Sequence, residues 1–421
     1  MKHRCSSLEE LCDIARRARH DTSSGEVVQS ERPSQPRWVR VNTLKTNIEE
    51  QLQSSFSGYS QVETLEHLIT NIGQEAFCID EHVPNLLAIP SSVNLTKSSA
   101  YLDGKIILQD KASCFPAYLL DPLDREGDIV DACAAPGNKT THLATLVDQE
   151  GHKSRIIHAC ERDKTRASLL AKMVGNSGAL KHVMVHAGQD FLGTDPCQPP
   201  WNMVSALLLD PSCSGSGMIG RDQDLEVVLP KRASPVAPQG KKRKRGKLQP
   251  AGKEPIVQEI LHGPVARTID SAGLEQRLKS LSVFQLKLLL HAFSFPQARR
   301  ITYSTCSIYE EENESVVVAA LSSDIARTRG WRILRREEQV DGMRKWHLRG
   351  QLGACKKPKG VSDWNASEIA EACIRCEKGT KDGTQGFFVV GFIRGHDLPK
   401  LNTSQGDDMS EVGDDFNGFD D

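Results

Sequence analysis

After residue 128, short apolar runs of strand length alternate with amphipathic segments of helix length. The apolar runs predict strands at residues 129–133, 155–160, 182–186, 203–209 and 300–304, with a late one at 387–393. The apolar spacing predicts helices at about residues 139–147, 164–174, 281–293 and 310–321. This alternation is typical of a mostly parallel, doubly wound α/β sheet, which we expect over residues 125–395.

The rest of the chain has other patterns. Residues 37–124 mix short apolar runs with turns and predict a small α+β domain before the main one. Residues 1–36 are polar and predict a frayed helix followed by a linker. Residues 222–270, rich in Pro, Gly, Lys and Gln, predict a mobile insertion, and residues 396–421 predict a disordered acidic tail.

The net charge of -2 conceals an uneven distribution along the chain. Residues 401–421 carry seven acidic residues and no Lys or Arg, so the preceding residues hold 53 basic and 48 acidic residues. One basic block, residues 241–247, supplies six of those positive charges. It fits a nuclear address signal or a nucleic-acid-contacting arm as well as a solvated loop. The near-neutral total is therefore no evidence against a polyanionic partner.

Composition argues against membranes, disulfides and metals. No run approaches the roughly 20 apolar residues that span a bilayer, so we expect no membrane contact. The 12 Cys lie outside any secretory context and are expected to be reduced thiols. Cys373 and Cys376 have half of a zinc spacing without a second pair nearby, so we expect no metal.

A turn of small residues follows the first strand predicted for the main domain. Residues 131–140 run from a strand through Gly137 into a helix, which would let a ligand approach backbone N–H groups. Glu161 ends the second strand, 24 residues after Gly137, where an acid can accept both ribose hydroxyls. Asp190 follows the third strand and is placed to contact an adenine edge. Because no phosphate-loop or Gly-x-Gly-x-x-Gly pattern occurs, we expect an adenosine ligand without a di- or triphosphate; any tight strand-to-helix turn would look similar.

Two thiols and an acid follow the next two predicted strands. Asp210 and Cys213 lie in a glycine-rich segment after residues 203–209, and Cys306 lies after residues 300–304. Cys often merely packs in a core, but both thiols lie at polar strand ends where a thiolate could be stabilised. Beside an adenosine site, such a pair suggests that one thiolate attacks carbon 6 of a pyrimidine and that carbon 5 then accepts a methyl group.

At these residues the sequence resembles the Nop/Sun family of RNA (cytosine-5)-methyltransferases. The resemblance is carried by residues 131–140, 209–215, 303–307 and 386–389, with further likeness at 40–45 and 108–113. The Ser-Gly-Ser-Gly-Met sequence after Cys213 is most similar to the Sun-type branch, subfamily five, whose known substrate is large-subunit ribosomal RNA.

The resemblance implies a Rossmann-like class I methyltransferase with an RNA-recognition-type domain at residues 37–124. Its cofactor would be S-adenosyl-L-methionine, and its partner would be ribosomal RNA or a pre-ribosome. It implies that Cys306 is the nucleophile, Cys213 the product-release thiol and Asp210 the acid beside the target base. Together with Asp190, the expected cofactor contacts are Cys133, Ala134, Ala135, Pro136, Gly137, Asn138, Lys139, Glu161, Arg166 and Asp210. We further expect a monomer in the nucleus and nucleolus.

Several alternatives stay open. The motifs do not distinguish a ribosomal RNA substrate from a transfer RNA substrate. DNA cytosine methyltransferases use as nucleophile a thiol at the position nearest Cys213, and if this protein followed them, the roles of Cys213 and Cys306 would be reversed. An exocyclic-amine methyltransferase would prefer an aromatic residue after Asp/Asn-Pro-Pro, which residues 210–213 lack. A catalytically silent ribosome-assembly factor is a further alternative, because members of this branch usually have a longer helical amino-terminal region.

A second basic stretch interleaves an aromatic residue. Residues 342–360 contain no acid and place Trp346 among Lys and Arg residues. Such cations would hold phosphates while Trp346 stacks on an exposed base. A charged surface loop fits the same pattern.

Overall fold

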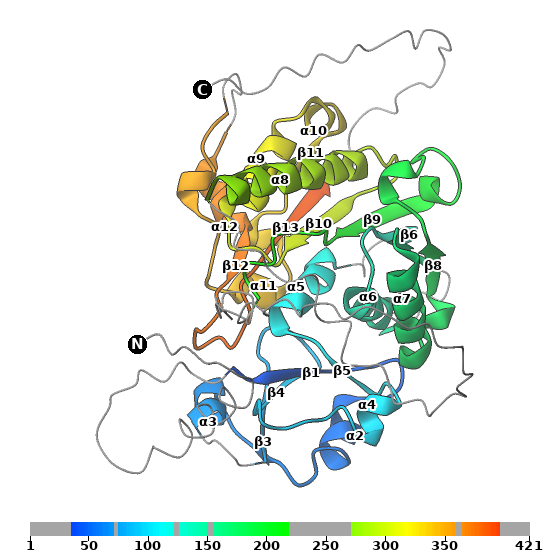
Figure 1. Cartoon of the computed structure of the whole chain (residues 1–421), viewed down its shortest axis with the longest axis vertical. Helices are drawn as coiled ribbons and strands as arrows, with labels where there is room; N and C mark the ends of the chain where they lie inside the picture. Colours follow the sequence, from blue (N-terminus) through cyan, green and yellow to red (C-terminus); the bar gives the residue numbers. More distant parts are fainter. Residues whose placement is uncertain are drawn as a thin grey trace, which may run out of the picture.

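The computed structural model describes residues 35–70, 75–121, 126–149, 155–218, 271–358 and 364–395. Over these ranges the chain forms two units, each built around one sheet (Figure 1). The predictions for the amino-terminal linker up to residue 34, the insertion at 222–270 with its basic block, and the acidic tail lie outside the described residues.

The smaller unit, drawn in blue and cyan in Figure 1, is a five-stranded sheet in the order β2-β3-β4-β1-β5. Its strands are β1 (Arg37–Val41), β2 (Ser60–Gln61), β3 (Ala76–Ile79), β4 (Leu86–Ile89) and β5 (Ile106–Leu108). Its helices are α2 (Ile48–Gln53), α3 (Leu65–Thr70) and α4 (Ser99–Leu102). The Asn47 and Ser98 side chains cap the amino termini of α2 and α4, which fixes where these short helices begin.

The larger unit is an eight-stranded sheet with the path β11-β13-β10-β9-β6-β7-β8, and β12 pairs with β13. Its strands are β6 (Asp128–Asp131), β7 (Ile157–Glu161), β8 (Val183–Ala187), β9 (Val204–Leu209), β10 (Arg300–Thr305), β11 (Trp331–Ile333), β12 (Ile374–Cys376) and β13 (Phe387–Arg394). Strands β6 to β10 pair in parallel, whereas β13 is antiparallel to β10. The prediction of a Rossmann-like, mostly parallel sheet is confirmed, and each predicted strand ends within two residues of the observed one.

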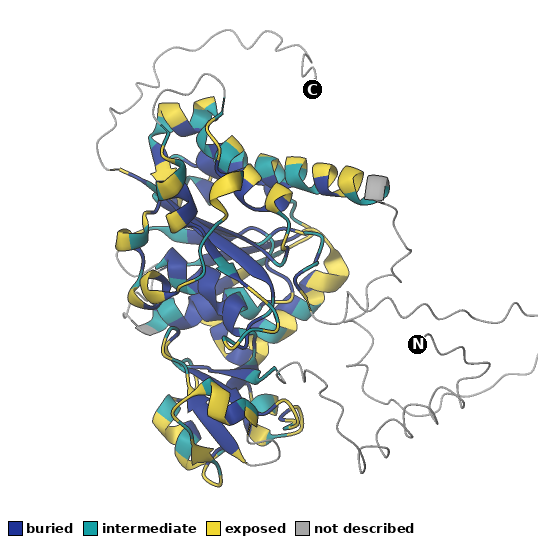
Figure 2. Ribbon diagram, turned by 90° about the vertical axis from the view of Figure 1, so that its left-hand side faces the viewer, coloured by how far each residue is buried: buried dark blue, intermediate teal, exposed yellow. Residues whose placement is uncertain are grey.

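Helices cover both faces of this sheet, and its strands are buried (Figure 2). The helices are α5 (Lys111–Leu120), α6 (Asn138–Gln149), α7 (Lys164–Ser177), α8 (Ser271–Phe293), α9 (Glu314–Leu321), α10 (Asp324–Arg329), α11 (Asp341–Lys345) and α12 (Ala366–Ala372). In β9, Leu208 packs with α5, α6 and α7 on one face, and Leu207 and Leu209 pack with α8 and α9 on the other. Burial on both faces explains why β9 is an unbroken apolar run.

Two helix predictions differ from the structure. The helix predicted at residues 281–293 begins ten residues earlier, at Ser271. The helix predicted at 310–321 is divided at Asn313 into a short 3-10 turn and α9. The Asn313 side chain accepts a hydrogen bond from Thr305 and donates one to the carbonyl of Ser307, so it ties this break to the end of β10.

Two buried cations join the units. Lys111 of α5 forms an ion pair with Asp80 after β3, and its ammonium lies 5.2 Å and 5.1 Å from the ring centroids of Trp38 and Trp346. Arg40 of β1 donates to Gln109, to the carbonyl of Asn138 and to the hydroxyl of Thr141. Because the buried guanidinium directs these donated bonds at both units, the contacts fix the smaller unit against the first turn of α6.

Trp346 lies in the core, so the prediction that it stacks on an exposed base is wrong. It has no exposed surface, and its ring packs edge-on against Phe115 and His82 at centroid distances of 5.1 Å and 5.0 Å. Its indole N–H donates to the carbonyl of Arg375. Burying the ring in the apolar cluster that the two units share is more favourable than exposing it.

Replacing Trp346 with Ala should therefore lower the free energy of unfolding by about 3–5 kcal/mol, because truncating a buried ring leaves a cavity. The matched control is His347→Ala, since His347 is 53% exposed and its truncation should change stability by less than about 0.5 kcal/mol. Urea denaturation measures both changes. A Trp346→Ala protein of normal stability with weakened RNA binding would contradict the buried placement.

Candidate active site

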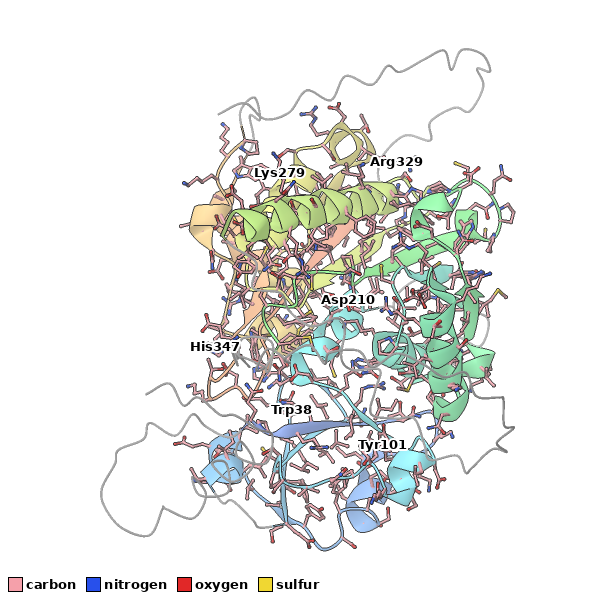
Figure 3. The ribbon with its side chains drawn as sticks, in the orientation of Figure 1. Trp38, Tyr101, Asp210, Lys279, Arg329 and His347 are labelled. Atoms are coloured by element: carbon pink, nitrogen blue, oxygen red, sulfur yellow. The ribbon has the colours of Figure 1, made fainter. Side chains whose placement is uncertain are left out.

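The parallel pairing of β9 with β10 brings the two cysteine segments together. Leu209, the last residue of β9, lies opposite Tyr303 of β10. Asp210 and Cys213 follow β9 directly, and Cys306 follows β10 directly. Asp210 lies in the middle of the molecule, below α8 and above α5 in the view of Figure 3.

A cleft of about 580 Å³ runs along this carboxyl edge of the sheet. Eight of the predicted site residues line it, namely Cys133, Ala135, Glu161, Arg166, Asp190, Asp210, Cys213 and Cys306. Five others do not line it, namely Ala134, Pro136, Gly137, Asn138 and Lys139. Phe191, Phe284 and Leu288 supply an apolar wall that was not predicted.

The turn after β6 is shaped by a glycine and by a buried acid. Gly137 has a φ of +114°, and a Cβ there would lie 3.0 Å from the side chain of Met173 in α7, so only glycine fits without strain. Asp131 accepts a hydrogen bond from the hydroxyl of Thr140 at 2.7 Å, which ties the end of β6 to α6. Burial raises the pKa of the Asp131 carboxyl to about 7.

Glu161 and Arg166 join the end of β7 to this turn. The Glu161 carboxylate accepts from the backbone N–H of Asp163 and lies 3.5 Å from the Arg166 guanidinium. Arg166 also donates to the carbonyl of Ala135 at 2.9 Å. Asp190 caps the short helix after β8 and lies 3.8 Å from Arg162. The acids predicted for a ribose and for an adenine edge thus both border the cleft.

Asp210 is held by two donors at the centre of the site. Lys139 forms an ion pair with one carboxylate oxygen at 2.8 Å, and the hydroxyl of Ser304 donates to the other at 2.7 Å. Burial lowers the pKa of Lys139, but the charge of Asp210 and its hydrogen bond more than offset this, so the pKa lies above its usual value. Lys139 is therefore a cation whose ammonium group points at Asp210. The predicted role of Lys139, as part of the backbone turn around the cofactor, did not include this ion pair.

The two thiols are in contact. The sulfur atoms of Cys213 and Cys306 lie 3.0 Å apart and share a hydrogen bond, and both residues are partly exposed and form no disulfide. The hydrogen bond to Cys306 and burial raise the pKa of the Cys213 thiol well above its usual value. Cys213 therefore keeps its proton at neutral pH and can donate it to the sulfur of Cys306.

Backbone contacts hold the two cysteine segments to each other. The N–H of Gly217 donates to the carbonyl of Cys306 at 3.0 Å, and the N–H of Ile308 donates to the hydroxyl of Ser216 at 3.1 Å. A Cβ at Gly217 would collide with the carbonyl of Gly386 at the start of β13. Glycine is thus required where three chain segments meet.

The Cys373 and Cys376 pair lies away from this site. Both side chains are buried in apolar clusters. Within the described ranges, no group of three or more His, Cys, Asp or Glu residues is arranged to hold a metal ion. The same part of the chain contains no helix both long and apolar enough to cross a membrane.

Two family models and several known proteins match this chain in sequence. The family model described as "NOL1/NOP2/Sun domain family member 5, ferredoxin-like domain" matches residues 35–109, and that of "16S rRNA methyltransferase RsmB/F" matches residues 117–244. The "25S rRNA (cytosine-C(5))-methyltransferase rcm1" of Schizosaccharomyces pombe is 39% identical over 358 residues, which cover 85% of this chain and 63% of that protein. The "28S rRNA (cytosine-C(5))-methyltransferase" of Mus musculus is 36% identical over 70% of this chain and 54% of its own length.

A solved structure supports the fold. The methyltransferase homologue from Pyrococcus horikoshii superposes with a TM-score of 0.54 at 20% identity and covers 86% of each chain. The sheet and its cleft define a Rossmann-like methyltransferase fold preceded by a small α+β unit. The chain belongs to the NOL1/NOP2/Sun family, and its first unit matches the ferredoxin-like domain of the member-5 type. It spans 63% and 54% of the length of the two relatives named above.

Several residues at the site were missed by sequence reasoning. Ser304 lies within the Thr-Cys-Ser motif region, and the alternation of β10 could have placed it beside Asp210. Phe284 and Leu288 are four residues apart in the predicted helix, so one face of α8 could have been assigned to the cleft. Gln285 and Glu312 bond the backbone on either side of Cys213. No sequence pattern marks them, because these bonds join distant parts of the chain.

The raised pKa of Asp131 makes stability depend on pH. Its contribution is fully present below its ordinary pKa of 3.8 and is lost as the pH rises through about 7. Asp131→Asn keeps an acceptor for Thr140 but cannot ionise. Between pH 5 and pH 8, the free energy of unfolding of the unsubstituted protein should fall by roughly 2–3 kcal/mol more than that of the variant. Equal slopes in urea denaturation at the two pH values would contradict the raised pKa.

Proposed function

We propose that the protein transfers a methyl group from S-adenosyl-L-methionine to carbon 5 of a cytosine in large-subunit ribosomal RNA. The observation that carries the proposal is the meeting of Asp210, Cys213 and Cys306 at a cleft that Glu161 and Asp190 also line. The names of the similar proteins, which specify 25S and 28S ribosomal RNA, support the choice of substrate.

The residues around the cleft fit a nucleoside cofactor. The small residues Cys133 and Ala135 of the turn after β6 line the cleft and leave room for a ligand beside them. Glu161 would accept the ribose hydroxyls, Asp190 would contact an adenine edge, and Phe191 with Leu288 would cover the apolar face of the base. When bound, S-adenosyl-L-methionine supplies the electrophilic methyl group.

Cys306 acts as the nucleophile in this proposal. Its thiolate bonds to carbon 6 of the cytosine, which makes carbon 5 nucleophilic towards the methyl group. Asp210, held by Lys139 and Ser304, hydrogen-bonds the ring and fixes its orientation, and the Lys139 ammonium beside it would offset the negative charge that develops on the ring. The contact between the two sulfur atoms supports a paired action, because a protonated Cys213 can donate to the Cys306 sulfur while the latter carries the negative charge.

Cys213 then takes part in release. After Cys306 has bonded to carbon 6, Cys213 loses the hydrogen bond that contributes most to its raised pKa. It can then lose its own proton to solvent, and the resulting thiolate accepts the carbon 5 proton. As that proton leaves, the double bond between carbons 5 and 6 re-forms, the bond between carbon 6 and sulfur breaks, and the methylated RNA is released.

The proposal also covers the RNA partner and the cellular compartment. The RNA would be presented to the cleft of the larger unit, as ribosomal RNA or as a pre-ribosome, by binding to a monomeric protein. A substrate of that kind points to the nucleus and nucleolus.

Bisulfite sequencing of ribosomal RNA from cells with and without the protein tests the reaction. We expect one 5-methylcytosine of the large-subunit RNA to be lost without the protein and restored when purified protein and S-adenosyl-L-methionine are added. An unchanged methylation pattern together with no transfer by the purified protein would overturn the proposed function.

A denaturing gel tests the two thiol roles. Cys213→Ala should accumulate a covalent protein–RNA adduct, because addition and methyl transfer proceed while release is blocked. Cys306→Ala should form no adduct, since it lacks the nucleophile. The opposite pattern would assign the nucleophile to Cys213.

A further inference from the structure

The segment that carries Cys213 is held on both sides by buried polar side chains from distant parts of the chain. Before the cysteine, the amide of Gln285 in α8 donates to the carbonyl of Ser212 at 3.1 Å. After it, the backbone N–H of Ser214 donates to the carboxylate of Glu312, at 2.9 Å and 3.3 Å to its two oxygens. Cys213 thus lies between two fixed neighbours.

The two holding side chains are also bonded to each other. The Gln285 amide donates to a Glu312 oxygen at 2.9 Å, and both residues have no exposed surface. The backbone carbonyl of Glu312 accepts from the hydroxyl of Tyr303 in β10 at 2.6 Å. These contacts fix the position of Cys213 relative to α8 and to β10, the strand that leads to Cys306.

This arrangement carries a cost to the fold. The amide oxygen of Gln285 is buried and has no hydrogen-bond partner in the described part of the chain. An unsatisfied buried acceptor destabilises the folded state, and a leucine at this position would avoid that penalty. Packing alone therefore does not explain an amide at this position. Its distinct contribution is the pair of hydrogen bonds that it donates to Ser212 and Glu312.

We propose that Glu312 and Gln285 are positioning residues that hold the Cys213 thiol against Cys306 and thereby set the rate of product release. The inference rests on the proposed function and deepens it. Cys306 follows β10 directly, and β10 is paired on both sides with β9 and β13, so its position does not depend on these two side chains in the same way. Loss of either side chain should displace Cys213 and leave the nucleophile in place.

The test separates methyl transfer from release. Gln285→Leu, Glu312→Ala and Glu312→Gln are mixed with ribosomal RNA and S-adenosyl-L-methionine carrying a labelled methyl group. We expect Gln285→Leu and Glu312→Ala to accumulate covalent adduct about tenfold over the unsubstituted protein, because a small misplacement of a reacting group slows its step strongly. The first-turnover rate of methyl transfer should change by less than about threefold.

Two comparisons exclude a merely structural effect. Glu312→Gln keeps an oxygen that can accept from Ser214, so its adduct level should lie between those of Glu312→Ala and the unsubstituted protein, and it serves if Glu312→Ala does not fold. Val317→Ala truncates a buried side chain of α9 away from the cysteine segment, so it should lower stability without raising the adduct level.

The outcomes are distinguishable. An unsubstituted protein that transfers no methyl group would overturn the proposed function, and the inference with it. If the unsubstituted protein turns over normally, two results for the variants would overturn the inference alone. One is a loss of methyl transfer and of adduct in equal proportion, and the other is product release at the normal rate.

Discussion

The parallel pairing of β9 with β10 is the constraint on which the rest of the site depends. Its register places Leu209 opposite Tyr303, so the segments after both strands meet at one edge of the sheet. Backbone hydrogen bonds between the strands fix this register, and a slip would exchange the side chains that pack against the helices on the two buried faces. The contact between Cys213 and Cys306 follows from it, although the two residues are 93 positions apart.

A chain of polar contacts connects this edge to the smaller unit. Asp210 is bonded by Lys139, and Lys139 also donates to Ser113 in α5. Arg40 of the smaller unit donates to Thr141, two residues after Lys139, in the first turn of α6. The smaller unit therefore supports the helix that carries Lys139, and the orientation of Asp210 depends indirectly on the contact between the two units.

The sheet and most of the cleft could be predicted from sequence because they depend on local patterns. Apolar runs locate strands such as β9, and strand ends locate Asp210, Cys213 and Cys306. Trp346 could not be placed, since its charged neighbours in sequence do not reveal that His82 and Phe115 surround it in space. The break at Asn313 likewise results from bonds to Thr305 and Ser307, which apolar spacing does not encode.

Which sulfur bonds to the cytosine is the most direct test of the account. RNA containing 5-fluorocytosine at the target position would trap the adduct, because carbon 5 then has no proton to lose after methylation. Proteolysis and mass spectrometry of the trapped complex identify the modified residue. The account predicts RNA attached to the peptide that contains Cys306. Attachment at Cys213, or methyl transfer to ordinary RNA without a trapped adduct, would contradict it.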